Sequence, residues 1–382
     1  MQLSVVILNY NVRHFLEVCV KSVQKALQNM DGEIIVVDNA STDGSKEMMQ
    51  SCFPGITYLY QEENAGFPKG NNIGVASAKG EFVCILNPDT IVAEDTFEVL
   101  LQEYKQLDHP GILGCHLIDG SGQFLAESKR GIPTPWVAFT KVTGLYKLFP
   151  KSSLFNQYYA QHIEEYQTGK ADILVGAFML LKRDLYLKTG GFDEGCFMYS
   201  DDIDLSYMVL KQGFNNYYIP STSVIHFKGE STLKDGTYMK RFKEAMQFFY
   251  TKHFRTSWFF DVIMNIGTAL FALKKTKEQG SETNPPEHYI LVSKNASVFQ
   301  SLQNQLSVSI DWVTHLEDVY TLDQPDKQIE ILIDNEIISF KEYIQFICQN
   351  KKSNKTFKIR TKNSCFFIGS NHKNDKGEVL SF

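Results

Sequence analysis

From Leu3 to about Phe227, the chain alternates short apolar runs with longer amphipathic stretches. The apolar runs include LSVVILNY, EIIVVDN, TYLYQ and FVCILN, and helical periodicity lies between them, first around residues 14 to 28. Continuous apolar, β-branched runs bounded by helices are typical of strands that are buried on both faces of a parallel sheet. The alternation therefore predicts an α/β fold with a mostly parallel central sheet.

Polar motifs directly follow two of these predicted strands, as VVDNASTDGS and ILNPDT. Ligands of open α/β sheets collect at the carboxyl ends of strands, so both motifs lie where a binding site is expected. Asp38 could accept hydrogen bonds from a nucleobase NH or a ribose hydroxyl. Asp43 is better explained as a cap of the next helix.

The second polar motif contains Asp89, a candidate ligand for a hard divalent cation that would neutralise a diphosphate. A plain turn after the strand is the alternative explanation of its Pro-Asp pair. In the upstream loop NAGFPKGNN, the backbone and Lys69 could face a diphosphate at a helix start, although loops of this composition are common.

The segment GGFDEGCFMYSDDIDLSY combines two glycines with a cluster of acids. A carboxylate at a helix start could deprotonate a hydroxyl group, provided that it lies near a metal and diphosphate site. The structural alternative is a helix that begins at Ser200 and places acids in its first turn, where the helix dipole favours them. His226 ends the run SVIHF, and its imidazole could ligate a cation or serve a purely structural role.

A chain of 382 residues exceeds what one hydrophobic core usually organises, so we expect a large domain and a smaller one. We assign the large domain to residues 1–250, with an irregular insertion at 119–170 that is rich in aromatic residues and proline. The runs YILVS, IEILID and TFKIR predict a small α/β domain over 287–382. No catalytic set of residues is evident in that domain, and its role has no prediction.

Residues 251–286 are expected to form an apolar helix and a linker. The run WFFDVIMNIGTALFAL at 258–273 has 16 residues, which is fewer than the roughly 20 that a helix needs to span a bilayer. Basic residues flank the run on both sides, and this pattern suits a helix that lies in the interface of an anionic membrane. A helix packed against the protein body is an equal alternative.

The net charge, the cysteines and the N-terminal residues predict which partners and which cellular location the protein has. A formal net charge of -6 gives no support to a nucleic-acid partner. The seven cysteines show no paired short spacing, and we expect reduced core thiols of a cytosolic protein. The start MQLSVVILNYN lacks a basic region, so we expect a first strand and a cytoplasmic location.

Taken in order, VVILNYN, VVDNASTDGS, NAGFPKGNN, ILNPDT, VGAFMLLKR, GGFDEGCFMYSDDIDL and HFKGES resemble the family 2 glycosyltransferases. The resemblance covers roughly residues 3–250 and is greatest with the rhamnosyltransferase-like branch that builds bacterial surface polysaccharides. It implies a GT-A fold, inversion at the anomeric carbon, a nucleotide-diphospho-sugar donor and a Mg²⁺ or Mn²⁺ cofactor. It also implies a glycan or lipid-linked glycan acceptor and a cytoplasmic enzyme, with a possible peripheral position on the inner face of the membrane.

The same resemblance implies a role for each candidate residue. Asp202 matches the catalytic base, and Asp89 and His226 match the metal-associated acid and histidine. Expected donor contacts are Asn9, Asp38, Asn64, Lys69 and Asn87, and expected acceptor contacts are Gly190, Gly191 and Asp201.

Three positions depart from the family pattern. Asn87 stands where many relatives have the first acid of the DxD motif, Asp201 replaces the usual Glu before the base, and Met208 stands where an arginine often follows. A sugar nucleotidyltransferase would need an N-terminal glycine-rich loop, which LNYNVRH lacks. A non-catalytic glycan-binding protein with a degenerate transferase fold is the other alternative, and it predicts loss of the acids, all of which are present.

Overall fold

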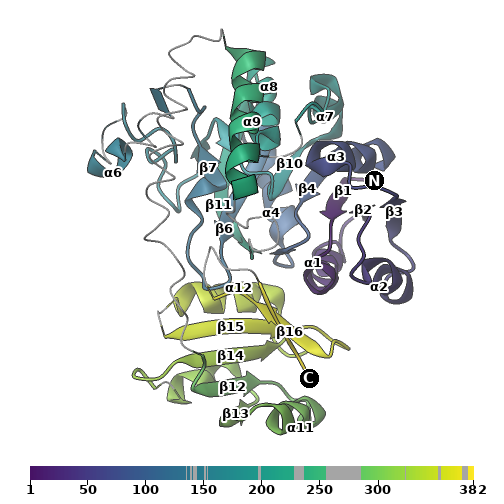
Figure 1. The fold of residues 1–382 in the computed structure, drawn as a ribbon, viewed down its shortest axis with the longest axis vertical. Helices are drawn as coiled ribbons and strands as arrows, with labels where there is room; N and C mark the ends of the chain where they lie inside the picture. Colours follow the sequence, from purple (N-terminus) through teal and green to yellow (C-terminus); the bar gives the residue numbers. More distant parts are fainter. Residues whose placement is uncertain are drawn as a thin grey trace.

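The computed structural model describes the chain apart from a set of short segments. These are residues 135, 138–139, 141–143, 150–151, 153, 197–198, 228–235, 255–284, 323, 352–353 and 372–376, together with the side chains of 236–243. The helix expected at 258–273 lies outside the described residues. Figure 1 shows two sheets, with the N-terminal sheet above the C-terminal one.

In the described chain, the N-terminal sheet has nine strands in the order β3-β2-β1-β4-β10-β6-β11-β5, with β8 paired to β11. The first four strands are parallel, and β6 and β11 are parallel to each other, whereas β10, β5 and β8 pair in antiparallel fashion. The mostly parallel sheet is thus confirmed. The strands are β1 (Leu3–Asn9), β2 (Gly32–Asn39), β3 (Thr57–Gln61), β4 (Phe82–Leu86), β5 (Thr90–Ile91), β6 (Pro110–Ile118), β8 (Gly169–Lys170), β10 (Phe178–Lys182) and β11 (Asn215–His226).

The apolar runs are continuous because both faces of the central strands are covered. Val5 and Val36 belong to a core shared with α1 and α2, whereas Val6 and Val37 belong to a core shared with α3 and α8. Successive side chains of a strand point to opposite faces, so each residue of such a run is buried. The helices of this domain are α1 (Arg13–Ala26), α2 (Ser45–Cys52), α3 (Gly66–Ser77), α4 (Thr96–Tyr104), α6 (Leu145–Leu148), α7 (Arg183–Thr189), α8 (Asp201–Lys211) and α9 (Gly236–His253).

Asp43 stabilises the starts of two helices. Its Oδ2 accepts a hydrogen bond from Arg13 N at the start of α1, and its Oδ1 accepts one from Ser45 N at the start of α2. Gly44, between them, has a φ of 83°, a conformation that favours glycine. The capping role predicted for Asp43 therefore agrees with its contacts.

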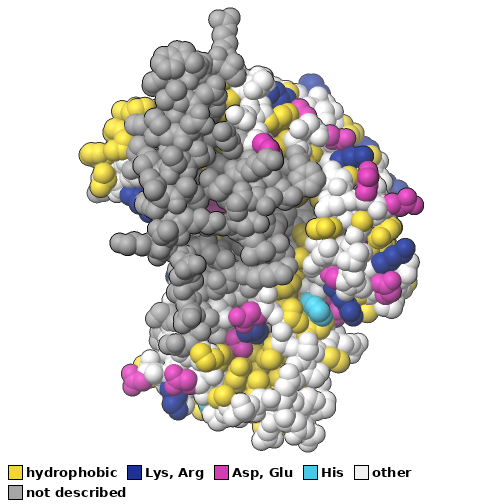
Figure 2. All heavy atoms as spheres, viewed as in Figure 1, with side chains coloured by type: hydrophobic (Ala, Val, Ile, Leu, Met, Phe, Trp, Pro, Cys, Tyr) yellow, Lys and Arg dark blue, Asp and Glu magenta, His cyan; other side chains and the backbone are white. Residues whose placement is uncertain are grey.

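The insertion at 119–170 is largely irregular where it is described. It includes a 3₁₀ turn, η1 (Ala126–Ser128), and the short strand β7 (Lys129–Arg130), which pairs with β9 (Ile173–Leu174). In Figure 2, apolar side chains gather at the edge where α6 lies, and Leu148, Phe149 and Leu154 are exposed. Through β7 and β9, the insertion is tied to the segment that leads into β10.

The second sheet follows the order β13-β12-β14-β15-β16-β17. Its first four strands are parallel and its last two pairings are antiparallel, so an additional C-terminal α/β domain is present. Its elements are β12 (His288–Val292), α11 (Ala296–Gln305), β13 (Ile310–Val313), η2 (Leu316–Leu322), β14 (Ile329–Asp334), α12 (Phe340–Gln349), β15 (Lys355–Arg360), β16 (Phe366–Gly369) and β17 (Glu378–Ser381). The predicted end of the large domain, residue 250, lies inside the helix α9, which ends at His253.

The two sheets share one apolar core. The helix α12 lies between them in Figure 1, and Tyr343 and Ile347 of this helix belong to the same cluster as Phe15, Ile91 and Phe227. Polar contacts reinforce this core. The Lys21 ammonium donates to Glu17 Oε1 and to Thr361 Oγ1, Lys362 O and Ser364 Oγ of the C-terminal domain.

The seven cysteines are all free thiols, as expected, but they are not all in the core. Cys52 and Cys365 are exposed, because they lie at the end of α2 and in the turn before β16 rather than inside an apolar run.

Among the described residues, no helix combines the length and the apolar character needed to cross a membrane.

Candidate active site

The carboxyl ends of β1 and β2 are joined by a buried polar network. Asn9 lies opposite Asp38 in the pairing of these strands, and its Nδ2 donates to Asp38 Oδ2 at 2.7 Å and to Ser41 Oγ at 3.0 Å. Asp38 Oδ1 accepts from Ser41 N at 2.7 Å. Asn9 and Asp38 have no exposed surface. Two of the predicted donor residues thus lie together, with Asp38 Oδ1 bound to the loop after β2 and Asp38 Oδ2 bound to Asn9 of β1.

A second group of polar side chains lies where β4, β5 and β11 meet. Asp89 Oδ1 lies 3.4 Å from His226 Nε2, and Asn87 Nδ2 lies 3.3 Å from the same nitrogen. Thr90 pairs with His226 in the β5–β11 ladder, and Phe227 N donates to Asp89 O at 3.0 Å. Three residues that the sequence singled out separately therefore form one cluster, although 137 positions separate Asp89 from His226 along the chain (226 minus 89).

The donor atoms of this cluster fit a divalent cation. A carboxylate and an imidazole provide one oxygen and one nitrogen ligand, and both side chains are less than one-tenth exposed. Within the described residues, no group of three or more His, Cys, Asp and Glu side chains could hold a metal ion by itself. Two protein ligands suffice for Mg²⁺ or Mn²⁺ where substrate phosphates and water complete the coordination.

The acid cluster at the start of α8 is held from two directions. Asp202 Oδ2 accepts a hydrogen bond from Arg130 Nη2 at 2.5 Å and another from Gly176 N at 3.1 Å. The next residue, Ala177, accepts through its carbonyl from Asn87 N at 3.0 Å. The backbone at Gly176 and Ala177 therefore links the predicted base to the segment that contains Asp89.

Asp201 precedes Asp202 in the chain, and its side chain is also buried. Burial and then the charge of Asp202 raise the pKa of Asp201 above its usual range, against the opposing effects of Arg130 and the backbone N–H groups of Asp201 and Tyr199. The carboxyl of Asp201 thus stays neutral to a higher pH than an ordinary aspartate does.

Asp204 lies in the first turn of α8, and it is a buried ion-pair partner. Its side chain is 2% exposed, and its oxygens lie 2.8 Å from Lys252 Nζ and 2.6 Å from His253 Nε2. Both partners belong to α9, so Asp204 attaches that helix to α8. The helix starts at Ser200 as predicted, but the hydroxyl of this residue contacts Cys196 Sγ instead of capping the helix.

The two glycines expected to contact the acceptor lie at the end of α7. Gly190 ends this helix with a φ of 90°, and Gly191 has a φ of 69°. A Cβ on Gly191 would lie 2.6 Å from Asn72 Oδ1, so only glycine fits this close approach. Both glycines line a cavity of about 330 Å³ whose walls also include Glu194 and Lys252.

The remaining predicted donor residues lie at the start of α3. Asn64 Oδ1 accepts from Gly66 N at 3.0 Å and from Asn39 Nδ2 at 3.3 Å, which connects α3 to the end of β2. Lys69 is exposed in the first turn of the helix.

No feature of the sequence indicated Arg130, the cation that pairs with Asp202. It lies in a two-residue strand inside the irregular insertion, where neither periodicity nor a motif indicates a site. Gly176, the backbone donor to Asp202, lies in the motif VGAFMLLKR, but nothing in this motif indicates a contact with the base.

Residues 4–204 match the profile of "Glycosyl transferase family 2". The chain belongs to this glycosyltransferase family. The matched range includes Asp38, Asp89 and Asp202, whereas the C-terminal domain lies outside it.

Named relatives agree with this assignment to family 2. The chain is 26% identical over 213 residues to an N-acetylglucosaminyl-diphospho-decaprenol L-rhamnosyltransferase of Mycobacterium tuberculosis, covering 53% of this chain and 68% of that one. It is 27% identical over 221 residues to the rhamnosyltransferase WbbL of Escherichia coli, covering 54% and 78%. A mannosyltransferase of Pyrobaculum calidifontis, solved with GDP-Man and Mn²⁺, matches with a TM-score of 0.46 and 16% identity over 92% of this chain and 86% of that one.

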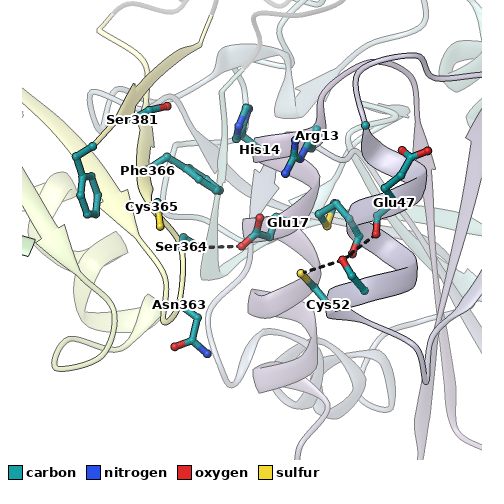
Figure 3. Close-up of a pocket in the computed structure, with 14 residues that line it drawn as sticks. Arg13, His14, Glu17, Glu47, Cys52, Asn363, Ser364, Cys365, Phe366 and Ser381 are labelled. Carbon is teal, nitrogen blue, oxygen red and sulfur yellow. Dashed lines mark hydrogen bonds between the residues drawn. The ribbon is translucent and has the colours of Figure 1, made fainter.

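A larger cavity of about 890 Å³ lies between the two domains of this family 2 member. Figure 3 shows α1 and α2 on one side and the β16 region on the other, with Ser364 donating to Glu17. None of the predicted site residues lines it. The cavity is therefore a feature of the domain interface, separate from the residues at the strand ends.

Proposed function

We propose that this protein is an inverting, metal-dependent glycosyltransferase that moves a sugar from a nucleotide-diphosphate donor to a hydroxyl of a lipid-linked glycan. The proposal places it in the synthesis of bacterial surface polysaccharides, at the cytoplasmic side of the membrane. The observation that carries it is the family 2 match over residues 4–204, which includes each predicted acid. The name of the Mycobacterium tuberculosis relative, which includes diphospho-decaprenol, supports the lipid-linked acceptor.

In the proposed mechanism, Asp202 takes the proton of the acceptor hydroxyl while that oxygen attacks the anomeric carbon. The bond to the nucleotide diphosphate breaks in the same displacement, so no covalent enzyme intermediate forms. The link from Asp202 through Gly176 and Ala177 to Asn87 supports this arrangement, because it fixes the proposed base relative to the segment where the diphosphate would bind.

Asp89 and His226 would hold the divalent cation, with Asn87 beside them. A bound Mg²⁺ or Mn²⁺ supplies charge neutralisation for the departing diphosphate. The imidazole nitrogen favours Mn²⁺ of the two, because Mg²⁺ prefers oxygen ligands. Asn9 and Asp38 are buried and would hold the loop after β2 beside the nucleoside, and Lys69 would face the diphosphate.

The test is a transfer assay with a panel of UDP, GDP and dTDP sugars, Mn²⁺ and a lipid-linked glycan acceptor. Replacing Asp202 with Asn removes the proton acceptor and keeps the size of the side chain. Transfer should then fall by about 10² to 10⁴ while donor affinity changes little.

The matched control is Asp204→Asn, two positions further along α8. This change should lower stability, because Lys252 and His253 lose their buried partner, but the folded protein should keep its transfer rate. Near-normal turnover by Asp202→Asn, or loss of turnover in Asp204→Asn alone, would contradict the assignment of the base. Donor binding without transfer in the wild type would favour the non-catalytic alternative.

A further inference from the structure

The two carboxylate oxygens of Asp202 differ in their surroundings. Oδ2 receives hydrogen bonds from Arg130 Nη2 and Gly176 N, whereas Oδ1 is buried and has no hydrogen-bond partner among the described residues. A buried acceptor without a partner is costly, and the oxygens of this side chain are therefore not equivalent. Oδ1 is the oxygen that remains available for a proton.

Arg130 shows the complementary asymmetry. Its Nε is also buried and lacks a hydrogen-bond partner among the described residues, although Nη2 of the same guanidinium holds Asp202. In the planar guanidinium, Nε–H and one N–H of Nη2 lie along one edge. The Arg130–Asp202 pair, joined through Nη2 and Oδ2, therefore has one unpaired donor, Nε, and one unpaired acceptor, Oδ1.

A hydroxyl group matches this pair of atoms. It can donate one hydrogen bond and accept others, whereas an ammonium only donates and a carboxylate only accepts. The side chains of Arg130 and Asp202 are 12% and 11% exposed, whereas Asp202 Oδ1 and Arg130 Nε are themselves buried. The short strand pair β7–β9 fixes the backbone of Arg130, and burial in the insertion restricts its side chain.

We propose that Arg130 and Asp202 together form the subsite for the acceptor hydroxyl. The hydroxyl donates its proton to Asp202 Oδ1 and accepts a hydrogen bond from Arg130 Nε, while the Arg130 Nη2 contact holds the carboxylate in place. This inference rests on the proposed transferase function and adds to it a specific residue from the insertion. It also gives the insertion a role in acceptor binding.

The test compares Arg130→Lys and Arg130→Met with the wild type for acceptor KM, kcat and donor dissociation constant. Lysine keeps a cation near Oδ2 but cannot present two N–H donors along one edge. We expect kcat/KM for the acceptor to fall by about 10 to 10²-fold in both variants, with donor affinity within twofold of the wild type. The double variant Arg130→Met with Asp202→Asn should be no slower than Asp202→Asn alone, because the two residues act as a unit.

His253→Asn is the matched control, because it removes a hydrogen-bond partner of Asp204 on the same helix, α8. Equal losses of kcat/KM in the His253 and Arg130 variants would overturn the subsite and leave only helix anchoring. Wild-type acceptor kinetics in Arg130→Lys would overturn it as well. A wild type that binds donor but transfers to no hydroxyl would instead overturn the proposed function, and a double-mutant cycle of unfolding for Arg130 and Asp202 would then still report whether the pair forms.

Discussion

Asp201 and Asp202, which are adjacent at the start of α8, lie in different electrostatic surroundings. Asp202 lies against the Arg130 guanidinium, whereas Asp201 is buried beside the charge of Asp202 and stays neutral to a higher pH than an ordinary aspartate does. When the surroundings of two nearby acids move their pKa values apart, the two acids can take different roles in catalysis. On this basis, the expected acceptor contact at Asp201 would be made by a hydrogen-bonding, neutral carboxyl.

The raised pKa of Asp201 predicts a pH-dependent effect on stability. A carboxyl whose pKa is raised by folding contributes stability that is fully present below its unfolded pKa, about 3.9, and is lost as the pH rises through the folded value. Asn mimics the neutral form at every pH. The free energy of unfolding of Asp201→Asn relative to wild type should therefore increase from pH 4 to pH 8.

Urea unfolding at pH 4, 6 and 8 measures this difference. Asp204→Asn is the control, because its carboxylate is paired with Lys252 and His253, and its loss should cost on the order of 1 to 3 kcal/mol at neutral pH. A difference between Asp201→Asn and wild type that stays constant with pH would show that Asp201 is ionised in the folded protein.

At the scale of the elements, the sequence predicted the strands that are buried on both faces and the motifs at their ends. The pattern was readable in β1, β2 and β4 because each contains a run of buried apolar residues, as a doubly covered strand requires. It could not reveal β7 or β9, which have two residues each and depend on pairing with each other. Arg130 was missed for that reason, since its partner on α8 comes 72 positions later in the chain.

The β5–β11 pair predicts how the candidate metal site should respond to mutation. Asp89→Ala removes one of the two proposed protein ligands and leaves the backbone bond from Phe227 N to Asp89 O intact. The variant should fold and should lose the Mn²⁺-dependent tightening of nucleotide diphosphate binding, as calorimetry can measure. Glu98→Gln, an exposed acid on α4, controls for the loss of one negative charge. Equal Mn²⁺ enhancement in both variants would refute the assignment of Asp89.

At the scale of the whole molecule, the C-terminal domain is packed against the rear of the candidate metal site. Ile91 and Phe227, which are close in sequence to Asp89 and His226, belong to the same apolar cluster as Tyr343 and Ile347 of α12. The segment after β5 is also attached to this helix. Glu94 accepts hydrogen bonds from Phe340 N and Lys341 N, and so caps α12 from the other domain.

This attachment predicts that a cap of α12 should influence the metal site. Glu94→Ala breaks the contact between α12 and the segment that carries Asp89, whereas Ser339→Ala removes a cap of the same helix from within the C-terminal domain. Both variants should lose about 0.5 to 2 kcal/mol of stability, the usual cost of a lost N-cap. Only Glu94→Ala should also weaken Mn²⁺-dependent nucleotide binding, because only it frees the segment that positions Asp89. Thermal unfolding and calorimetry on both full-length variants separate the effects, and equal nucleotide affinities would mean that the C-terminal domain does not position the site through this contact.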